Sequence, residues 1–182
     1  MQVETLDRYE QLLLERAVPR GMVAFADSDH LHDRHVLDSL RAVPYIDRDI
    51  GPVVDLGSGA GLPGVPVAVA RPDLSLTLVE PRQARAAFLE LVVEQLVLPN
   101  VRVFAGPAQG LSPHYAAALA RGLGDVSRSW SIAASVLVPE GMLIYWAGRT
   151  FRPSDVPAGA LLRTADEPAL ESRGPIVIMT RQ

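Results

Sequence analysis

Apolar residues recur along this chain with two different periods, and each period predicts a type of secondary structure. Residues 5–18 place apolar side chains three or four positions apart, which is typical of an amphipathic helix. Pro19 and Gly21 then end that helix. Residues 29–42 predict a second helix with the same period. We expect its buried stripe to consist of Leu31, Val36, Leu37 and Leu40.

Short strands and helices alternate in the middle of the chain. The stretch "GPVVDLGSGAGLPGVPVAVARPD" (51–73) predicts a strand, a glycine loop and a helix. "LSLTLVE" (74–80) predicts a second strand, "RQARAAFLELVVEQL" (82–96) a helix and "NVRVFAG" (100–106) a third strand. Strands joined through helices form a parallel sheet with right-handed crossovers. We therefore expect an α/β fold in which helices cover both faces of a mostly parallel sheet, with ligands at the carboxyl ends of the strands.

Length and composition narrow the class of protein. A chain of 182 residues with 48% apolar residues predicts a single domain over 1–182, with an N-terminal helical cap at about 1–48. The start is too charged for a secretory signal and no apolar run is long enough to span a bilayer, so we expect a soluble, cytoplasmic protein. The absence of cysteine excludes disulfides, a thiolate nucleophile and sulfur-ligated zinc. A net charge of −4 argues against binding to nucleic acid mainly by non-specific phosphate attraction.

The stretch "DLGSGAGLPG" lies where the first strand is expected to end. Gly57, Gly59 and Gly61 lack side chains where the backbone must turn sharply and approach a ligand. Pro63, near the start of the next helix, lacks an amide hydrogen that would otherwise be unsatisfied. Glu80 ends the second strand, where a carboxylate can accept hydrogen bonds from both hydroxyls of a ribose. The loop and the acid together predict a cofactor that contains a nucleoside.

Two cofactors fit this loop. Gly59, Gly61 and Gly64 satisfy the dinucleotide pattern G-x-G-x-x-G. S-Adenosylmethionine is favoured because Asp55 precedes the glycines, so that an acid at the strand end can act, directly or through water, on the positively charged methionine portion. An NAD enzyme would usually also need a second domain for its substrate. A glycine turn that binds nothing is the remaining alternative. We predict a Rossmann-like class I methyltransferase that uses S-adenosylmethionine.

Three segments make a more specific resemblance visible. They are "RHVLDSL" (34–40), "VVDLGSGAGLPGVPVAVARPDLSLTLVE" (53–80) and "RAAFLELVVEQLVLPNVRVFAG" (85–106). The glycine loop followed at once by Leu-Pro-Gly, with Arg-His-x-x-Asp-Ser-Leu upstream, resembles the 16S ribosomal RNA guanine-N7 methyltransferases, the glucose-inhibited division protein B family. The resemblance extends from about Leu12 to the end of the chain and identifies a divergent member.

The resemblance implies further elements and site residues. It places a fourth strand near 115–120, where alanine propensity alone favours a helix, and a helix that then runs to a Pro-x-Gly turn. It also makes "GPIVIMTRQ" (174–182) the closing strand, antiparallel to the rest. Arg121, directly after the fourth strand, is expected to line the cleft for cofactor and substrate. The implied cofactor contacts are Gly57, Leu62, Ala108 and Gln109.

The segment "DHLHDRHVLDSL" (29–40) holds three of the four histidines and allows three interpretations. On a helix, His32 and His35 share a face, and so do His35 and Asp38, so a metal site is geometrically possible, although no known ligand signature is present. An exposed helix with ordinary surface ion pairs is the second interpretation. The favoured interpretation follows the resemblance, which places four residues beside the active cleft. They are Arg34, His35, Asp38 and Ser39.

The resemblance implies methyl transfer to guanine N7 of 16S ribosomal RNA. The expected partners are ribosomal RNA or the small ribosomal subunit, without a membrane or a metal, and we expect a monomer. Guanine N7 already carries a lone pair, so orientation can supply most of the acceleration without a general base, and Asp38 could stabilise the positive charge on the methylated base. Two alternatives stay open. One is a relative that methylates another RNA or a small molecule, and the other is a non-catalytic module that binds the cofactor.

Two basic residues typical of the family are missing. Ala84 stands where the family has a lysine after the ribose acid, and Ala147 stands where it has a lysine after the fifth strand. The loss of two positive charges near the RNA path predicts weaker phosphate contacts. Arg82, Arg85 and Arg149 are close enough in sequence to compensate.

Overall fold

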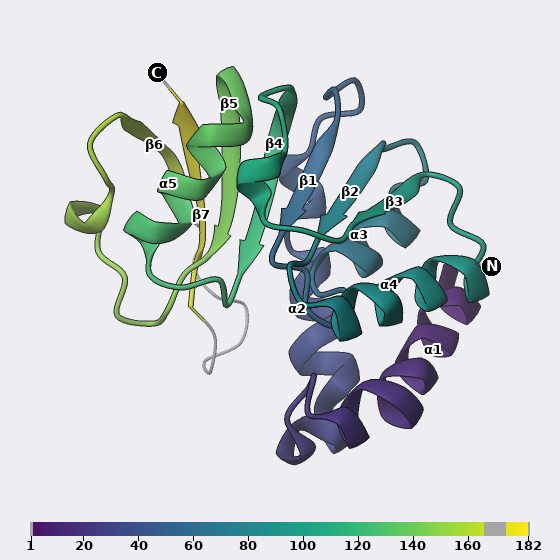
Figure 1. Cartoon of the computed structure of the whole chain (residues 1–182). Helices are drawn as coiled ribbons and strands as arrows, with labels where there is room; N and C mark the ends of the chain where they lie inside the picture. The colour runs from purple at the N-terminus through teal and green to yellow at the C-terminus, as the bar shows by residue number, and fades with distance from the viewer. Residues whose placement is uncertain (1, 166–173, 182) are drawn as a thin grey trace.

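The computed structural model describes residues 2–165 and 174–181 and contains one sheet of seven strands (Figure 1). Their order across the sheet is β3-β2-β1-β4-β5-β7-β6. The neighbours from β3 to β5 pair in parallel, whereas β7 is antiparallel to β5 and to β6. The predicted mostly parallel sheet with an antiparallel closing strand is therefore confirmed. The strands are β1 Val53–Leu56, β2 Leu76–Val79, β3 Val101–Phe104, β4 Tyr115–Arg121, β5 Leu137–Trp146, β6 Ala160–Ala165 and β7 Ile176–Arg181.

Helices cover both faces of the sheet, and each face has its own hydrophobic cluster. The cluster on one face joins the sheet to the N-terminal helices, α3 and α4. The cluster on the other face joins it to α5. Both clusters draw on alternate residues of the same strands, since neighbouring side chains of a strand point to opposite faces. The helices are α1 Gln2–Leu12, α2 Asp38–Leu40, α3 Gly64–Ala70, α4 Gln83–Gln95 and α5 Val126–Val136. No helix in the described ranges combines the length and apolar character needed to cross a membrane.

The N-terminal segment differs in detail from the two regular helices predicted. After α1 it continues through a π-helical turn at Leu13–Ala17 and short 3₁₀ turns, and it reaches α2 through a second π-helical turn at His32–Leu37. Leu31 and Val36 are buried as expected, but Leu37 is 45% exposed, so its predicted burial is wrong. A π turn brings residues five apart onto one face. Val36 therefore follows Leu31 into the core and Leu37 turns outward.

The C-terminal half confirms some expectations and corrects others. The strand predicted near 115–120 is present as β4, with Arg121 at its end. Helix α5 ends at Val136 and β5 starts at the next residue, so the expected Pro-x-Gly turn falls inside β5, where Glu140 has φ +62°. Pro139 and Gly141 lie in an irregular part of β5, where the pairing with β4 slips between Leu137 and Met142. Strand β6 is not among the elements predicted from the sequence.

The N-terminal segment packs directly on the glycine loop. Tyr9 of α1 is fully buried, and its hydroxyl donates to the carbonyl oxygen of Ala60 at 2.8 Å. Gly61 has φ +99°, and a Cβ there would lie 2.9 Å from the Tyr9 hydroxyl oxygen and 2.7 Å from a methyl carbon of Val65. Only glycine fits between the two elements. The division of the chain into one domain with a cap at about 1–48 stays a prediction, and this contact ties that segment to the loop.

Asp55 at the end of β1 anchors the start of α3. Its carboxylate is fully buried, and Oδ2 accepts a hydrogen bond from the backbone N–H of Gly64 at 3.1 Å. Burial raises the pKa of Asp55 from 3.8 to about 6, and hydrogen bonds from Ser58 and Gly64 oppose that rise. The other oxygen, Oδ1, makes no hydrogen bond to the described residues. Burial at this junction therefore disfavours the ionised form of Asp55.

Replacing Asp55 by asparagine should change how stability depends on pH. A rise of the pKa from 3.8 to about 6 corresponds to about 3 kcal/mol at about 1.4 kcal/mol per unit. The folded form holds the proton more tightly, so this part of the wild-type stability is present below pH 4 and is lost as the pH rises through 6. In urea unfolding, the free energy of unfolding of Asp55→Asn should rise relative to that of the wild type by up to about 3 kcal/mol between pH 4 and pH 7.

The exposed acid Asp29, changed to asparagine, reports the effect of losing a surface carboxylate in the same experiment. A stability difference between Asp55→Asn and the wild type that stays constant from pH 4 to pH 7 would contradict the assignment of a buried, reluctantly ionised acid.

Candidate active site

The glycine loop and Glu80 meet at the carboxyl ends of β1 and β2. Glu80 is only 3% exposed, yet both of its carboxylate oxygens have backbone partners. Oε2 accepts from the N–H of Gly59 at 3.0 Å and Oε1 from the N–H of Arg82 at 2.8 Å. Each carboxylate oxygen has a further lone pair. The predicted ribose acid is therefore fixed beside the glycine loop with acceptor capacity left over.

The loop after β4 closes over the same site. A Cβ on Gly57, whose φ is +70°, would lie 2.7 Å from Cδ1 of Leu123. Leu123 stands between Gly122 and Gly124, which both have positive φ angles of 66° and 144°. The absence of a side chain at Gly57 thus lets this leucine rest on the glycine loop. Leu123 forms one wall of the candidate cofactor site.

The remaining predicted cofactor contacts are spread over the two faces of the sheet. Leu62 is buried in the cluster that contains α3, and Ala108 is buried in the cluster that contains α5. Ala108 begins a short 3₁₀ helix after β3, and Gln109 beside it is exposed. Of the predicted cofactor contacts, Gly59 and Glu80 touch each other directly, while the roles of Leu62, Ala108 and Gln109 stay predictions.

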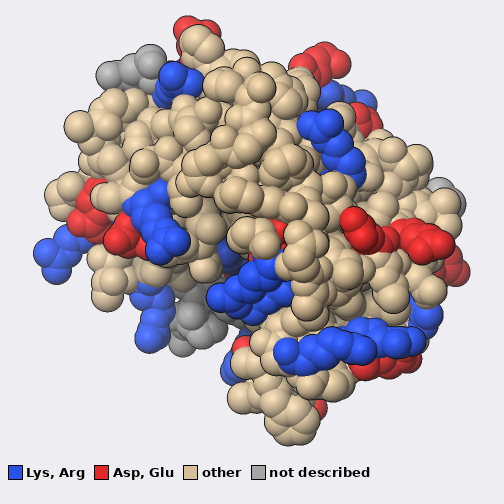
Figure 2. All heavy atoms as spheres, viewed as in Figure 1, with Lys and Arg blue, Asp and Glu red and all other residues tan. Residues whose placement is uncertain are grey.

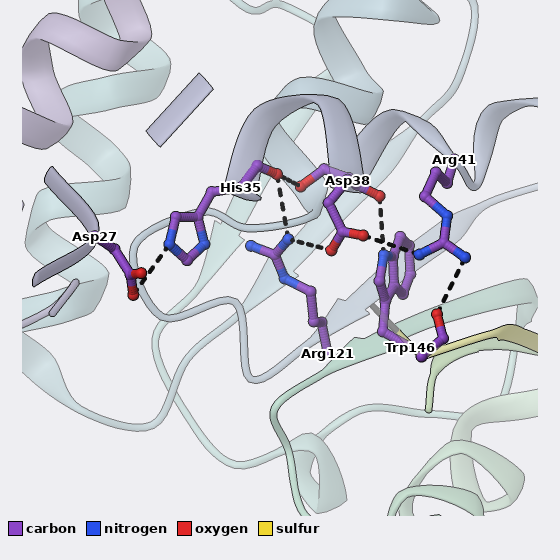
Figure 3. Close-up of polar contacts among 8 residues, drawn as sticks. Asp27, His35, Asp38, Arg41, Arg121 and Trp146 are labelled. Atoms are coloured by element: carbon purple, nitrogen blue, oxygen red, sulfur yellow. Dashed lines mark hydrogen bonds and ion pairs between the residues drawn. The ribbon is translucent and has the colours of Figure 1, made fainter. Parts of the chain in front are cut away.

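Asp38 is the centre of a buried polar cluster that joins three parts of the chain (Figure 3). Its side chain is 4% exposed and lies 3.2 Å from Nη1 of Arg121 at the end of β4 and 2.9 Å from Nη1 of Arg41. Trp146 at the end of β5 donates its indole N–H to the backbone carbonyl of Asp38 at 3.0 Å. Arg121 also donates to the carbonyl of His35 at 3.2 Å. Asp38 and Arg121, which were separately expected at the cleft, are thus in direct contact.

The four residues predicted beside the cleft face different ways. Ser39 is buried, and its hydroxyl donates to the carbonyl of His35 at 2.5 Å. The ring of His35 turns to Asp27, with Nε2 3.5 Å from Oδ2 (Figure 3). Arg34 is exposed and pairs with the other oxygen of Asp27 at 3.1 Å. Asp38 and Ser39 therefore belong to the buried cluster, and Arg34 forms a surface pair.

The histidines do not converge on a common point. His32 lies 2.7 Å from Glu10 of α1, and that hydrogen bond raises its pKa, while His35 faces Asp27. Among the residues that the structure describes, no three histidines, aspartates or glutamates are grouped as metal ligands would be. The residue of segment 29–40 that contacts Arg41, Arg121 and Trp146 is Asp38.

Two arginines contact the carboxylate at the centre of the cluster. Two guanidinium groups, Arg41 and Arg121, contact the one carboxylate of Asp38. Burial lowers the pKa of Arg121, and Asp38 counteracts that effect. An arginine still keeps its proton at neutral pH. The cluster therefore holds two guanidinium groups in direct contact with one buried carboxylate at the carboxyl edge of the sheet.

Sequence reasoning missed three residues of this site. Arg41 lies three positions after Asp38 on the helix, a spacing that places the two side chains on one face and could have revealed the pair. Leu123 is marked only by its flanking glycines. Tyr9 carries no signal beyond the helical period, because its partner Ala60 is 51 residues away.

The chain is similar to curated methyltransferases over most of its length. A family model described as rRNA small subunit methyltransferase G matches residues 2–152. The ribosomal RNA small subunit methyltransferase G of Frankia casuarinae is 39% identical over 149 residues, which are 78% of this chain and 55% of that protein. Its counterpart in Nocardioides sp. is 36% identical and covers 84% of this chain and 62% of that protein. The one in Paracoccus denitrificans is 35% identical and covers 83% and 79%. The chain thus spans less than two thirds of the Frankia and Nocardioides relatives.

Solved structures with little sequence identity share the fold. Magnesium protoporphyrin IX methyltransferase (ChlM) from Synechocystis PCC 6803, solved with bound SAM, superposes with a TM-score of 0.66 at 14% identity and covers 88% of this chain and 85% of that one. A mutant of MtNAS in complex with S-adenosylmethionine gives a TM-score of 0.70 at 16% identity, covering 100% and 76%. These likenesses confirm the predicted class I methyltransferase fold. From its match over residues 2–152 and its relatives at 35–39% identity, the chain belongs to the rRNA small subunit methyltransferase G family.

Proposed function

We propose that this protein transfers a methyl group from S-adenosylmethionine to guanine N7 of 16S ribosomal RNA. The observation that carries the proposal is the contact of Glu80 with the glycine loop at the carboxyl ends of β1 and β2, next to the polar cluster around Asp38. The names of the relatives, ribosomal RNA small subunit methyltransferase G, supply the substrate class. We place the reaction in the cytoplasm, on ribosomal RNA or the small ribosomal subunit, with a monomeric enzyme that needs no metal.

The residues present fit S-adenosylmethionine. Glu80 has lone pairs to accept both ribose hydroxyls, and the glycine loop offers backbone without side chains beside it. Asp55 keeps one buried oxygen without a partner in the described residues, which a water or the amino group of the cofactor can use. We assign cofactor binding to Asp55, Gly57, Gly59, Gly61, Leu62, Glu80, Ala108, Gln109 and Arg121.

Bound S-adenosylmethionine supplies an electrophilic methyl group on a sulfonium. Guanine N7 attacks with a lone pair that is already available, so the protein needs to orient the base and not to remove a proton. Orientation alone can be worth roughly 7 to 11 kcal/mol. Asp38 and Ser39 are buried and fixed through their contacts with Arg121 and His35. We propose that this rigid cluster, with Arg34 and His35 on the same helix, positions the target nucleotide.

An RNA substrate fits the site better than a small apolar molecule. The hollow beside Arg121 has a volume of about 240 Å³ and is lined by Asp38, Arg41, Arg121 and Arg149. Figure 2 shows several arginine side chains on this face of the molecule, with acidic side chains among them. A charged and open hollow suits a phosphodiester strand, whereas an apolar ligand would call for an enclosed apolar pocket.

Methyl transfer to small ribosomal subunits that lack the modification tests the proposal. With labelled S-adenosylmethionine, we expect label in 16S ribosomal RNA and 7-methylguanine after digestion of that RNA. The Glu80→Gln variant should weaken cofactor binding by about tenfold or more, because charge-assisted hydrogen bonds contribute roughly 1.5–3 kcal/mol. Label in another base or in no RNA, from wild-type protein that binds the cofactor, would overturn the proposed substrate.

The Asp38→Asn variant tests the polar cluster. Asparagine keeps the shape of the side chain but loses the charge that holds Arg121. We expect a turnover at least tenfold lower, which corresponds to about 1.4 kcal/mol of activation free energy. The affinity for the cofactor should stay within threefold of wild type. Both are measured on protein shown to be folded at the assay temperature. An unchanged turnover would remove Asp38 from the catalytic account.

A further inference from the structure

We propose that Tyr9 is a positioning residue for the cofactor. Its hydroxyl holds the carbonyl of Ala60 and thereby keeps the glycine loop in the conformation that binds S-adenosylmethionine. Helix α1, which precedes every strand of the sheet, thus acts on cofactor binding through this loop. The identity of the ligand rests on the proposed function, whereas the RNA substrate has no part in the inference.

Two anchors from distant parts of the chain hold adjacent residues of the glycine loop. The N–H of Gly59 donates to Oε2 of Glu80 at 3.0 Å. The carbonyl of the next residue, Ala60, accepts from the hydroxyl of Tyr9 at 2.8 Å. One anchor comes from the end of β2 and the other from α1, so the loop conformation depends on both elements.

The backbone around Ala60 is free to rotate once the second anchor is lost. Gly59 has φ +60° and Gly61 has φ +99°, so a glycine in a left-handed conformation stands on each side of Ala60. Glycine reaches many other backbone conformations at little cost. Ala60 is 4% exposed, and a buried carbonyl without a donor is unfavourable. We therefore expect the empty loop to rearrange when the hydroxyl is removed, and ligand binding must then restore its order, which lowers the affinity.

Tyr9 and Gly61 are also matched in shape. A Cβ on Gly61 would lie 2.9 Å from the hydroxyl oxygen of Tyr9 and 3.3 Å from a methyl carbon of Leu89. The hydroxyl thus fills the space that the missing side chain of Gly61 leaves. Removing it takes away both a hydrogen bond and a packing contact on the loop.

The hydroxyl of Tyr9 keeps its proton and acts as a donor. Tyr9 is fully buried, and burial raises its pKa well above the ordinary value of 10, an effect that Arg121 opposes. Arg121 is therefore close enough to influence the hydroxyl electrostatically. The hydroxyl contacts the glycine loop on the side of the molecule that also carries the polar cluster around Asp38, and it remains neutral at physiological pH.

Binding of S-adenosylhomocysteine, measured by isothermal titration calorimetry, tests the role of Tyr9 without RNA. Tyr9→Phe removes the hydroxyl and keeps the ring in the core. We expect the Kd to rise by about threefold to tenfold, the factor that loss of one hydrogen bond typically represents. In methyl transfer, the KM for S-adenosylmethionine should rise by a larger factor than kcat falls, because bound cofactor orders the loop again.

Tyr115→Phe is the matched control. Tyr115, at the start of β4, is also fully buried, and its hydroxyl accepts from Arg102 at 2.9 Å and donates to Thr77 at 3.3 Å. The variant loses the same group from a site that does not contact the glycine loop. Both variants should have a lower free energy of unfolding than the wild type, but the Kd of Tyr115→Phe for S-adenosylhomocysteine should stay within about twofold of wild type.

Hydrogen exchange of the wild-type protein decides the question if Tyr9→Phe does not fold. Coupling between two sites is reciprocal, so bound S-adenosylhomocysteine should slow the exchange of amides around Tyr9 in α1. Strand β6, at the far edge of the sheet, is the reference and should exchange at the same rate with and without the ligand.

A Kd of Tyr9→Phe within about twofold of wild type overturns the positioning role. An equal rise in the Kd of Tyr115→Phe overturns it as well, because the effect would then be one of general stability. Exchange in α1 that the ligand leaves unchanged, or wild-type protein that binds no S-adenosylhomocysteine, has the same consequence. A selective loss of affinity in Tyr9→Phe, when the wild type forms no 7-methylguanine, supports the role of Tyr9 while the proposed RNA substrate fails.

Discussion

The buried carboxylate of Asp38, shared by two arginines, is the interaction on which the arrangement of the site depends. It joins the N-terminal helices to the end of β4, 83 residues away in sequence, and its backbone carbonyl holds Trp146 of β5. Removing one member of a buried ion pair typically costs several kcal/mol, because the other charge stays buried without a partner. The N-terminal segment therefore cannot move from the sheet edge without exposing or stranding these charges. The same contacts that fix the fold fix the candidate active site.

The glycine loop is held from several sides by residues of different elements. Tyr9 of α1 binds the carbonyl of Ala60, Glu80 binds the N–H of Gly59, and Leu123 rests on Gly57. A loop with several glycines would otherwise have many conformations to lose on binding a ligand. Fixing it in advance reduces that cost. The N-terminal segment thus contributes to both halves of the site, to the loop through Tyr9 and to the cleft through Asp38.

Much of the sheet could be predicted from local sequence, because each of its signals lies within a few residues. The alternation around 53–80 predicts β1, the loop, α3 and β2 on periodicity and glycine spacing alone. Strand β4 could not be predicted in this way, since its alanines favour a helix, and it required the resemblance to a family. Its burial between β1 and β5 overrides that propensity. The predicted burial of Leu37 is wrong for a related reason. The π turn that rotates this side chain outward has no recognisable sequence signature.

The site could be predicted in its members but not in their roles. Asp38 and Arg121 were both expected at the cleft, yet their direct contact crosses 83 residues, and sequence spacing says nothing about such distances. Arg34 was expected beside them because it belongs to the same motif, but its side chain leaves the helix on the exposed side and meets Asp27. Arg41 was overlooked because the motif ends one residue before it. Motifs thus identified the helix, and only the fold shows which of its faces is used.

The coupling between Asp38 and Arg121 tests this account most directly. A double-mutant cycle with Asp38→Asn, Arg121→Gln and both changes together, followed by urea unfolding, isolates their interaction from their separate effects. The account predicts that the double variant is more stable than the sum of the single losses implies, by about 1.5 kcal/mol or more, because Asp38→Asn alone leaves the buried Arg121 without its carboxylate, whereas the double change also removes that charge. Additivity within about 0.5 kcal/mol would contradict the central role given to this pair.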